Sequence, residues 1–202
     1  MIEGKVYYFE KPGQDNTEDV FRIARARAEE LGINTIVVAS TRGVTAVRAV
    51  EFFAGRRVIA VGHITGYREL DAQVFTEENR QKVEAGGGAV LTTTEVFAGG
   101  VDRAMRNKFN MSLVADTIAG TLRVLGQGVK VVCEICMMAA DAGLVRTDED
   151  VIAIGGTGRG ADTAAVLTPV NSTRFFDLRI KEILCKPLLA QRPAAPPAGH
   201  HH

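Results

Sequence analysis

Histidine is scarce in this chain. There are four, and three of them are the last three residues, after the stretch "QRPAAPPAG". We interpret residues 189–202 as a disordered, Pro/Ala-rich tail of the kind that a tag remnant leaves, and residues 1–188 as a single domain. That domain holds one histidine, His63, so a metal centre built from several histidines is excluded and we expect no metal site.

Cysteines are also few, and the chain has neither a net charge nor a long apolar run. The three cysteines are an odd count, and the formal net charge is zero. An odd count argues against a disulfide scaffold, and a neutral chain offers no general attraction for nucleic acid. No apolar run approaches the roughly 20 residues of a membrane span, and the start, "MIEGKVYYFE", has no signal-peptide pattern. We therefore expect a cytoplasmic protein without nucleic-acid or membrane partners.

Cys133 and Cys136 form a C-x-x-C pattern within "VKVVCEICMMAA". A redox pair of this spacing lies exposed at a helix N-terminus, where the thiolate is stabilised. This pair lies inside an apolar helical segment, so we interpret both as buried structural thiols.

Alternating strand and helix patterns predict an α/β domain. Asp15 with Glu18 resembles a capping box for a helix that Gly32 ends, and apolar strands follow at buried positions. The expected strands are 5–9, 35–39, 57–62 and 89–93, with helices beginning near Asp15, 46 and 76. Strands that are apolar on both faces indicate a parallel sheet covered by helices, in a three-layer sandwich.

The second half of the chain departs from this alternation. Residues 96–143 are mostly helical in pattern, and two further strands are expected at 150–156 and 163–170, joined by "TGRGAD". So short a connection predicts an antiparallel pair, which gives the sheet one reversed strand at its edge. The segment "FFDLRIKEILCKP" fits either a short helix or a strand.

The segment "ASTRGVTA" follows the second strand and opens a helix. In a parallel sheet this loop lies at the carboxyl edge, and the first amides of the helix have no internal partners. Backbone amides, hydroxyls and one arginine would together suit a terminal phosphate. The candidate residues are Ser40, Thr41, Arg42, Gly43, Val44 and Thr45. The alternative is a helix start capped by a hydroxyl residue, without a ligand.

The segment "IGGTGRGADT" contains a nominal G-x-G-x-x-A pattern, but a dinucleotide fingerprint must open a helix and this one precedes a strand. The remaining alternatives are a hairpin turn and a ligand-facing loop. The candidate residues are Gly156, Thr157, Gly158, Arg159, Gly160, Asp162 and Thr163.

His63, with Thr65 beside it, follows the third strand and so belongs to the same edge. It would serve as an acid/base group or as a hydrogen-bond partner for a ligand ring, or equally as a structural loop histidine. A serine-hydrolase triad would have to recruit His63, and no G-x-S-x-G elbow is present.

Several of these segments, in this order, resemble the C-terminal α/β domain of pyruvate kinases. They are "IVVASTRGVTA", "RVIAVG" and "DVIAIGGTGRGADTAAVL". The whole chain from about Val6 to Pro187 is more similar to the stand-alone proteins of that domain type, through "YFEKPGQDNTED", "GQGVKVVCEICMMAADAGL" and "STRFFDLRIKEILCKP". These 202 residues do not include the barrel that carries phosphotransfer in pyruvate kinase, so we do not expect them to act as a pyruvate kinase.

The resemblance implies a sheet of order 3-2-1-4-5 with strand 5 antiparallel at the edge and the strand at 5–9 added to it. It also implies that the loops at 40–45 and 156–163 converge. In pyruvate kinases the first loop binds the phosphate of a sugar-phosphate effector. Here Arg42 and Val44 replace a small hydroxyl residue and an arginine, so a single phosphate is expected rather than a sugar bisphosphate.

The stand-alone group resembles flavin mononucleotide (FMN) binders, in which the flavin ring would point towards His63 and the loop at 156–163, called the glycine-rich loop below. Asn16 and Thr17, after the first strand, would reach the same rim. We therefore expect an FMN-binding or other phospholigand-binding protein. The alternatives are a ligand-gated regulatory or scaffolding module without catalysis, and a small hydrolase or transferase that uses His63. Self-association into a homo-oligomer is also expected, because the kinase domain forms interfaces.

Overall fold

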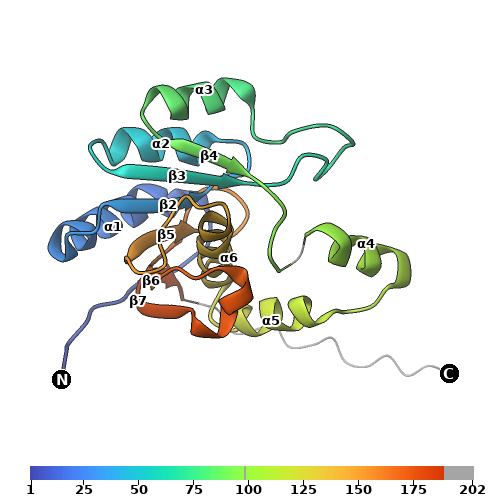
Figure 1. Cartoon of the computed structure of the whole chain (residues 1–202). Helices are drawn as coiled ribbons and strands as arrows, with labels where there is room; N and C mark the ends of the chain where they lie inside the picture. The colour runs from blue at the N-terminus through green and yellow to red at the C-terminus, as the bar shows by residue number, and fades with distance from the viewer. Residues whose placement is uncertain (98, 189–202) are drawn as a thin grey trace.

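A computed structural model describes residues 1–97 and 99–188 of the chain (Figure 1). The expected tail at 189–202 lies outside the described residues. The strands form a seven-stranded sheet of order β1-β7-β6-β5-β2-β3-β4. Their bounds are β1 Tyr7–Phe9, β2 Thr35–Ala39, β3 Arg57–Gly62, β4 Ala89–Thr92, β5 Val151–Gly155, β6 Thr163–Thr168 and β7 Arg179–Pro187.

The strand order confirms the expected core and corrects its edge. The run β4-β3-β2-β5-β6 is the implied 3-2-1-4-5 order, and β6 is antiparallel to β5. The edge position of β6 is wrong, because β7 pairs with it antiparallel and β1 pairs parallel with β7. The physical reason is burial: β6 is enclosed for most of its length and needs a neighbour on each side. The ambiguous segment "FFDLRIKEILCKP" supplies that neighbour as strand β7.

The helices cover both faces of the sheet, and alternate strand residues divide between two cores. Helices α1 (Thr17–Leu31), α2 (Val44–Phe52) and α3 (Glu77–Ala85) pack on one face, against Ile36 and Val38 of β2. Helices α5 (Val114–Arg123) and α6 (Gln127–Asp141) pack on the other, where Val37 points. Helix α4 (Gly100–Phe109) has no buried residue and lies away from the sheet (Figure 1). Three-layer α/β architecture is therefore confirmed.

The start of α1 differs from the expected capping box. Residues Gln14–Asn16 form a short 3-10 helix, and Asn16 is the N-cap without a side-chain bond to the helix amides. Glu18 does not reach back to the Asp15 backbone, because its carboxylate accepts hydrogen bonds from Arg48 of α2 at 2.8 and 3.0 Å. The predicted end is confirmed: Gly32 is left-handed, with φ of 66°.

Candidate functional site

The loops that follow the parallel strands share one edge of the sheet. Strand β2 pairs in parallel with both β3 and β5, and β4 pairs in parallel with β3. Their carboxyl ends therefore lead to a common rim, which residues 40–43, 63–76, 93–97 and 156–162 form. Helix α6 also begins here, since a Cβ on Gly128 would lie 2.4 Å from Cβ of Thr163 at the start of β6.

The turn from Thr41 to Thr45, here called the amide turn, leaves its backbone donors free. Ser40 is buried and does not belong to that set, because its amide donates to Val61 and its hydroxyl accepts from the Ala46 amide at 3.3 Å. The amides of the turn itself donate to no acceptor among residues 1–97 and 99–188. Consecutive free amides at a helix N-terminus attract anions.

The geometry of the amide turn is fixed from the side of α3. Gly43 has φ of 94°, and a Cβ there would lie 2.5 Å from Cβ of Asn79 and 2.6 Å from the Phe75 ring. The Arg42 carbonyl accepts hydrogen bonds from the Asn79 side chain at 2.9 Å and the Thr76 amide at 3.3 Å. Glycine is therefore required at position 43 for conformation and packing.

Side chains around the amide turn are partly open to solvent. Arg42 and Val44 are exposed, whereas Thr41 and Thr45 are half-buried. The Thr45 hydroxyl makes no hydrogen bond to any other group in the described part of the chain. The predicted phosphate donors of this loop therefore have two different places. The Ser40 hydroxyl holds the start of α2, and the donors of Thr41 to Thr45 line the rim.

The glycine-rich loop after β5 uses its polar groups internally. Asp162 is fully buried, and its Oδ2 accepts hydrogen bonds from the Gly13 and Thr157 amides, each at 3.0 Å. Its Oδ1 accepts the hydroxyl of Thr163, also fully buried, at 2.8 Å. Asp162 therefore joins the loop after β1 to the loop after β5.

Of the two predicted residues after β1, Thr17 contacts the glycine-rich loop and Asn16 holds its own loop. The Thr17 hydroxyl accepts the Ala161 amide at 3.0 Å and donates to the Gln14 carbonyl at 2.6 Å. The Asn16 side chain donates to the carbonyls of Lys11 and Gly13. The bond between Thr17 and Ala161 joins the two loops, and the other bonds hold the loop after β1 in shape. Gly160, with φ of 70°, has its Cα so near Gln14 that a Cβ would lie 2.5 Å from the Gln14 Cα.

The outer part of the glycine-rich loop remains open. Gly158 and Arg159 are exposed, and Thr157 and Gly156 are half-buried. Arg159 makes no ion pair with any described residue, which leaves its charge available at the rim.

His63 lies between two side chains from neighbouring strand ends. Its Nδ1 is 2.5 Å from Oε1 of Glu95, and its Nε2 is 3.4 Å from Oγ1 of Thr41. Tyr67 stacks on the imidazole with ring centroids 3.9 Å apart, and the Arg103 guanidinium lies 4.3 Å from the Tyr67 centroid. Thr65 is exposed and accepts from Gln73 at 3.1 Å.

Glu95 is the residue that the sequence interpretation missed. Burial by itself would raise the pKa of Glu95, but the hydrogen bond to His63, a backbone hydrogen bond and the charges of His63 and Arg103 together lower it. Its other oxygen, Oε2, is buried without a partner among the described residues. The available signal was its place shortly after β4, because the acid follows a strand that ends at the same rim.

Helix α6 supports the segment that carries Glu95. Lys130 and Glu134 form a buried ion pair on α6, and Oε1 of Glu134 accepts the Phe97 amide at 3.0 Å. The two cysteines of the same helix are fully buried, as expected. Burial raises the pKa of the Cys133 thiol to about 12 and that of Cys136 further, so neither is a reactive thiolate.

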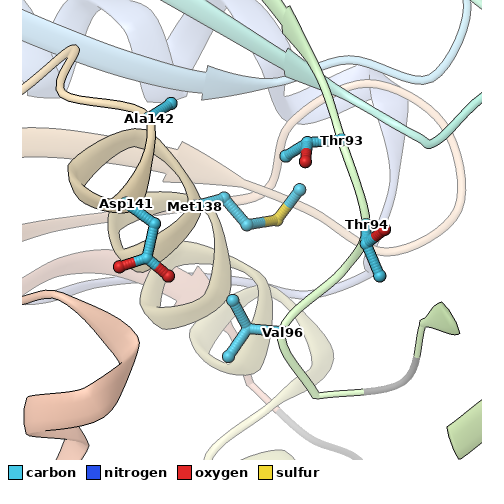
Figure 2. Close-up of a pocket in the computed structure, with 6 residues that line it drawn as sticks. All are labelled: Thr93, Thr94, Val96, Met138, Asp141 and Ala142. Atoms are coloured by element: carbon cyan, nitrogen blue, oxygen red, sulfur yellow. The ribbon is translucent and has the colours of Figure 1, made fainter. Parts of the chain in front are cut away.

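Two hollows lie outside the amide turn and the glycine-rich loop, although one of them borders the segment after β4 that carries Glu95. One of about 160 Å³ is lined by the segment after β4 and the last turns of α6 (Figure 2). The other, of about 360 Å³, is lined by residues around Arg146. Neither contains a predicted site residue, and we favour the rim because its donors and charges suit a ligand. Within residues 1–97 and 99–188, no helix is long and apolar enough for a membrane span and no cluster of three metal-ligating side chains occurs.

Comparison with known proteins gives a family match that includes both rim loops. The family model described as pyruvate kinase, alpha/beta domain, matches residues 18–167. A solved pyruvate kinase from Cryptosporidium parvum is similar at 11% identity over 76% of this chain, with a TM-score of 0.40. O-ureido-L-serine synthase is similar at 18% identity over 68%, with a TM-score of 0.30. The chain spans 23% of the first protein and 49% of the second.

Proposed function

Because this chain belongs to the pyruvate kinase alpha/beta domain family, we propose that it binds a phosphorylated small molecule at the carboxyl edge of its sheet, with FMN as the ligand. The observation that carries the proposal is the amide turn, whose donors from Thr41 to Thr45 have no acceptor within the described part of the chain. A phosphate monoester supplies several acceptor oxygens and up to two negative charges, which such a turn and helix dipole attract.

The side chains around the turn support a single phosphate. The Thr41 and Thr45 hydroxyls add donors and Arg42 adds a positive charge, while the exposed Val44 adds neither. The rest of the ligand would extend along the rim towards His63 on one side and Thr157 to Arg159 on the other. In this proposal the ring chemistry of a bound flavin belongs to the flavin, and the chain binds and orients it.

FMN is the preferred ligand because the sequence resembles the stand-alone members of this domain type. The half-buried His63–Tyr67 stack would present a flat surface next to an aromatic ring system. Asp162, Thr163 and Thr17 would contribute by holding the glycine-rich loop in place, since their hydrogen bonds go to protein groups. Asn16 would do the same for the loop after β1.

The test is the absorption spectrum of the purified chain before and after titration with FMN. We expect saturable flavin absorption that co-purifies with the protein. Thr45→Asp should weaken FMN binding about tenfold or more, because it places a negative charge beside the phosphate. An acidic residue in the first turn of α2 favours the helix, so the fold should be retained.

Thr147→Asp is the matched control, because Thr147 is exposed and lies before β5, at the opposite edge of the sheet. It should bind FMN as the unchanged chain does. A chain that takes up no FMN would contradict the flavin assignment. Uptake of a sugar phosphate or nucleotide at the amide turn would then favour the regulatory module without catalysis.

A further inference from the structure

Three consecutive parallel strands each place one polar side chain in a single hydrogen-bonded row. Thr41 follows β2, His63 follows β3 and Glu95 follows β4. The row runs from Oε1 of Glu95 to Nδ1 of His63 at 2.5 Å, and from Nε2 of His63 to Oγ1 of Thr41 at 3.4 Å. A hydroxyl, an imidazole and a carboxylate in this order form the arrangement that activates a nucleophile in many unrelated folds.

The surroundings hold His63 in the orientation that this chemistry requires. When the imidazole is neutral and donates from Nδ1 to the ionised Glu95, the lone pair of Nε2 faces Thr41. Tyr67 covers one face of the ring, with an interplanar angle of 13°. Glu95 itself is 10% exposed and His63 28%, so the acid is enclosed while the imidazole remains accessible.

The amide turn completes the requirements for acyl transfer. Thr41 is its first residue, and the amides of Arg42 to Thr45 have no acceptor within the described residues. Free amides directly after a nucleophile are the donors that stabilise the oxyanion of a tetrahedral intermediate. The sequence lacks a G-x-S-x-G elbow, but Thr41, which is half-buried, has the same place between a strand and the helix that follows it.

We propose that Thr41, His63 and Glu95 form a nucleophile, base and positioning residue that cleave small carboxylic esters. Oγ of Thr41 bonds to the carbonyl carbon while its proton moves to Nε2 of His63. The bond from that carbon to the alkoxy oxygen then breaks, and the leaving oxygen takes the proton. Water attacks the resulting ester of Thr41, gives one proton to His63, and releases the acid as Oγ recovers its proton. Glu95 keeps the imidazole in place throughout.

The test uses p-nitrophenyl acetate as the probe, with p-nitrophenolate release and peptide mass spectrometry as readouts. We expect an acetyl group on the peptide that contains Thr41, and hydrolysis that Thr41→Val and His63→Ala lower about 100-fold or more. Thr41→Ser should retain both, because it keeps the hydroxyl. Thr147→Val, at the opposite edge of the sheet, should leave the rate unchanged.

Glu95→Gln should lower the rate about tenfold or more and change its pH profile, because the amide no longer fixes the imidazole tautomer. Thermal melts verify that each variant is folded. Hydrolysis equal in the unchanged chain and in folded Thr41→Val would overturn the proposal, as would acetylation of Thr41 that persists in His63→Ala. This inference does not rest on FMN binding. If inorganic phosphate binds the amides of the turn, it should inhibit hydrolysis. Hydrolysis that phosphate does not inhibit would contradict phosphate binding and leave the proposed nucleophile in place.

Discussion

The amide turn and the glycine-rich loop look alike in the sequence, since each follows a buried strand and combines glycine, hydroxyl residues and one arginine. In the structure they differ in where their polar groups go. The amide turn leaves its backbone donors free, and the inner part of the glycine-rich loop satisfies its own through Asp162 and Thr17. One loop therefore offers a surface to a ligand, and the other forms the rigid wall next to it.

The difference follows from burial. Asp162 and Thr163 are fully enclosed, so any unsatisfied polar atom there would raise the free energy of the folded state. The amide turn is partly open to solvent, where water can satisfy free amides, and the proposed ligand would replace that water. Substitutions in the two loops should therefore affect different measurements: stability in the glycine-rich loop, and ligand binding in the amide turn.

The largest expected loss of stability is at the centre of the glycine-rich loop. Asp162→Ala removes an acceptor from two amides and a hydroxyl, all part-buried or buried. We expect the free energy of unfolding, measured by urea denaturation, to fall by about 4 kcal/mol. Asp15→Ala, at an exposed carboxylate in the adjoining loop, is the control and should change it by less than about 0.5 kcal/mol. Equal effects would mean that Asp162 does not join the loops.

Gly43 is the exception in the amide turn, because it affects stability as well. Gly43→Ala would place a Cβ in a left-handed conformation and against the Asn79 and Phe75 side chains. We therefore expect the free energy of unfolding to fall by about 3 kcal/mol. Gly32→Ala, at φ of 66° with open space around the added Cβ, is the control and should lose about 1 kcal/mol. If the two variants unfold at the same urea concentration, packing against α3 does not hold the turn.

The pH dependence of stability tests the contact between Glu95 and His63. The folded state lowers the pKa of Glu95 from its ordinary value of 4.5, so the unfolded state binds the proton more tightly. The carboxylate then stabilises the fold above pH 4.5, and this contribution is lost as the pH falls through the lower folded-state value. Glu95→Gln should remove that part of the acid dependence, measured as unfolding free energy against pH, and His63→Phe should weaken it. An unchanged curve in both would contradict the contact.

The smallest expected effect is at the outer part of the glycine-rich loop. Arg159 is exposed and has no ion pair among the described residues, so Arg159→Ala should change the unfolding free energy by less than about 0.5 kcal/mol. It should weaken FMN binding by about twofold to fivefold, the effect of one exposed charge near a phosphate. Arg57→Ala, at the opposite edge of the sheet, should leave FMN binding unchanged. A larger loss than in Thr45→Asp would move the phosphate site to this loop.

Much of the fold could be predicted from local patterns. The apolar runs of β2, β3 and β5, the helical spacing in α1 and the short turn between β5 and β6 each carry their own signal, and all are confirmed. The segment of β7 could not be assigned, because its burial alternates irregularly along the strand. The capping box was wrong because Glu18 pairs with Arg48, a residue in a different helix.

The candidate site could be predicted only in part. That several loops lie at one rim followed from the parallel strands. Thr17 contacts the glycine-rich loop through the Ala161 amide, whereas the hydrogen bonds of Asn16 stay within its own loop. Glu95 could not be chosen among many acidic residues, because its importance depends on His63, 32 positions earlier. The amide turn and the glycine-rich loop are also alike in sequence. The sequence therefore did not indicate that only the amide turn leaves its backbone amides without acceptors.

The sequence by itself determined the α/β class, the burial of Cys133 and Cys136, and the loops that reach the carboxyl edge, because periodicity and apolar content act over a few residues. The tertiary structure decided which polar groups in those loops are satisfied by the protein. Gly13 donates to Asp162 across 149 positions, and Thr41 meets His63 across 22. Such partners are selected by the packing of distant segments, so no local pattern contains them.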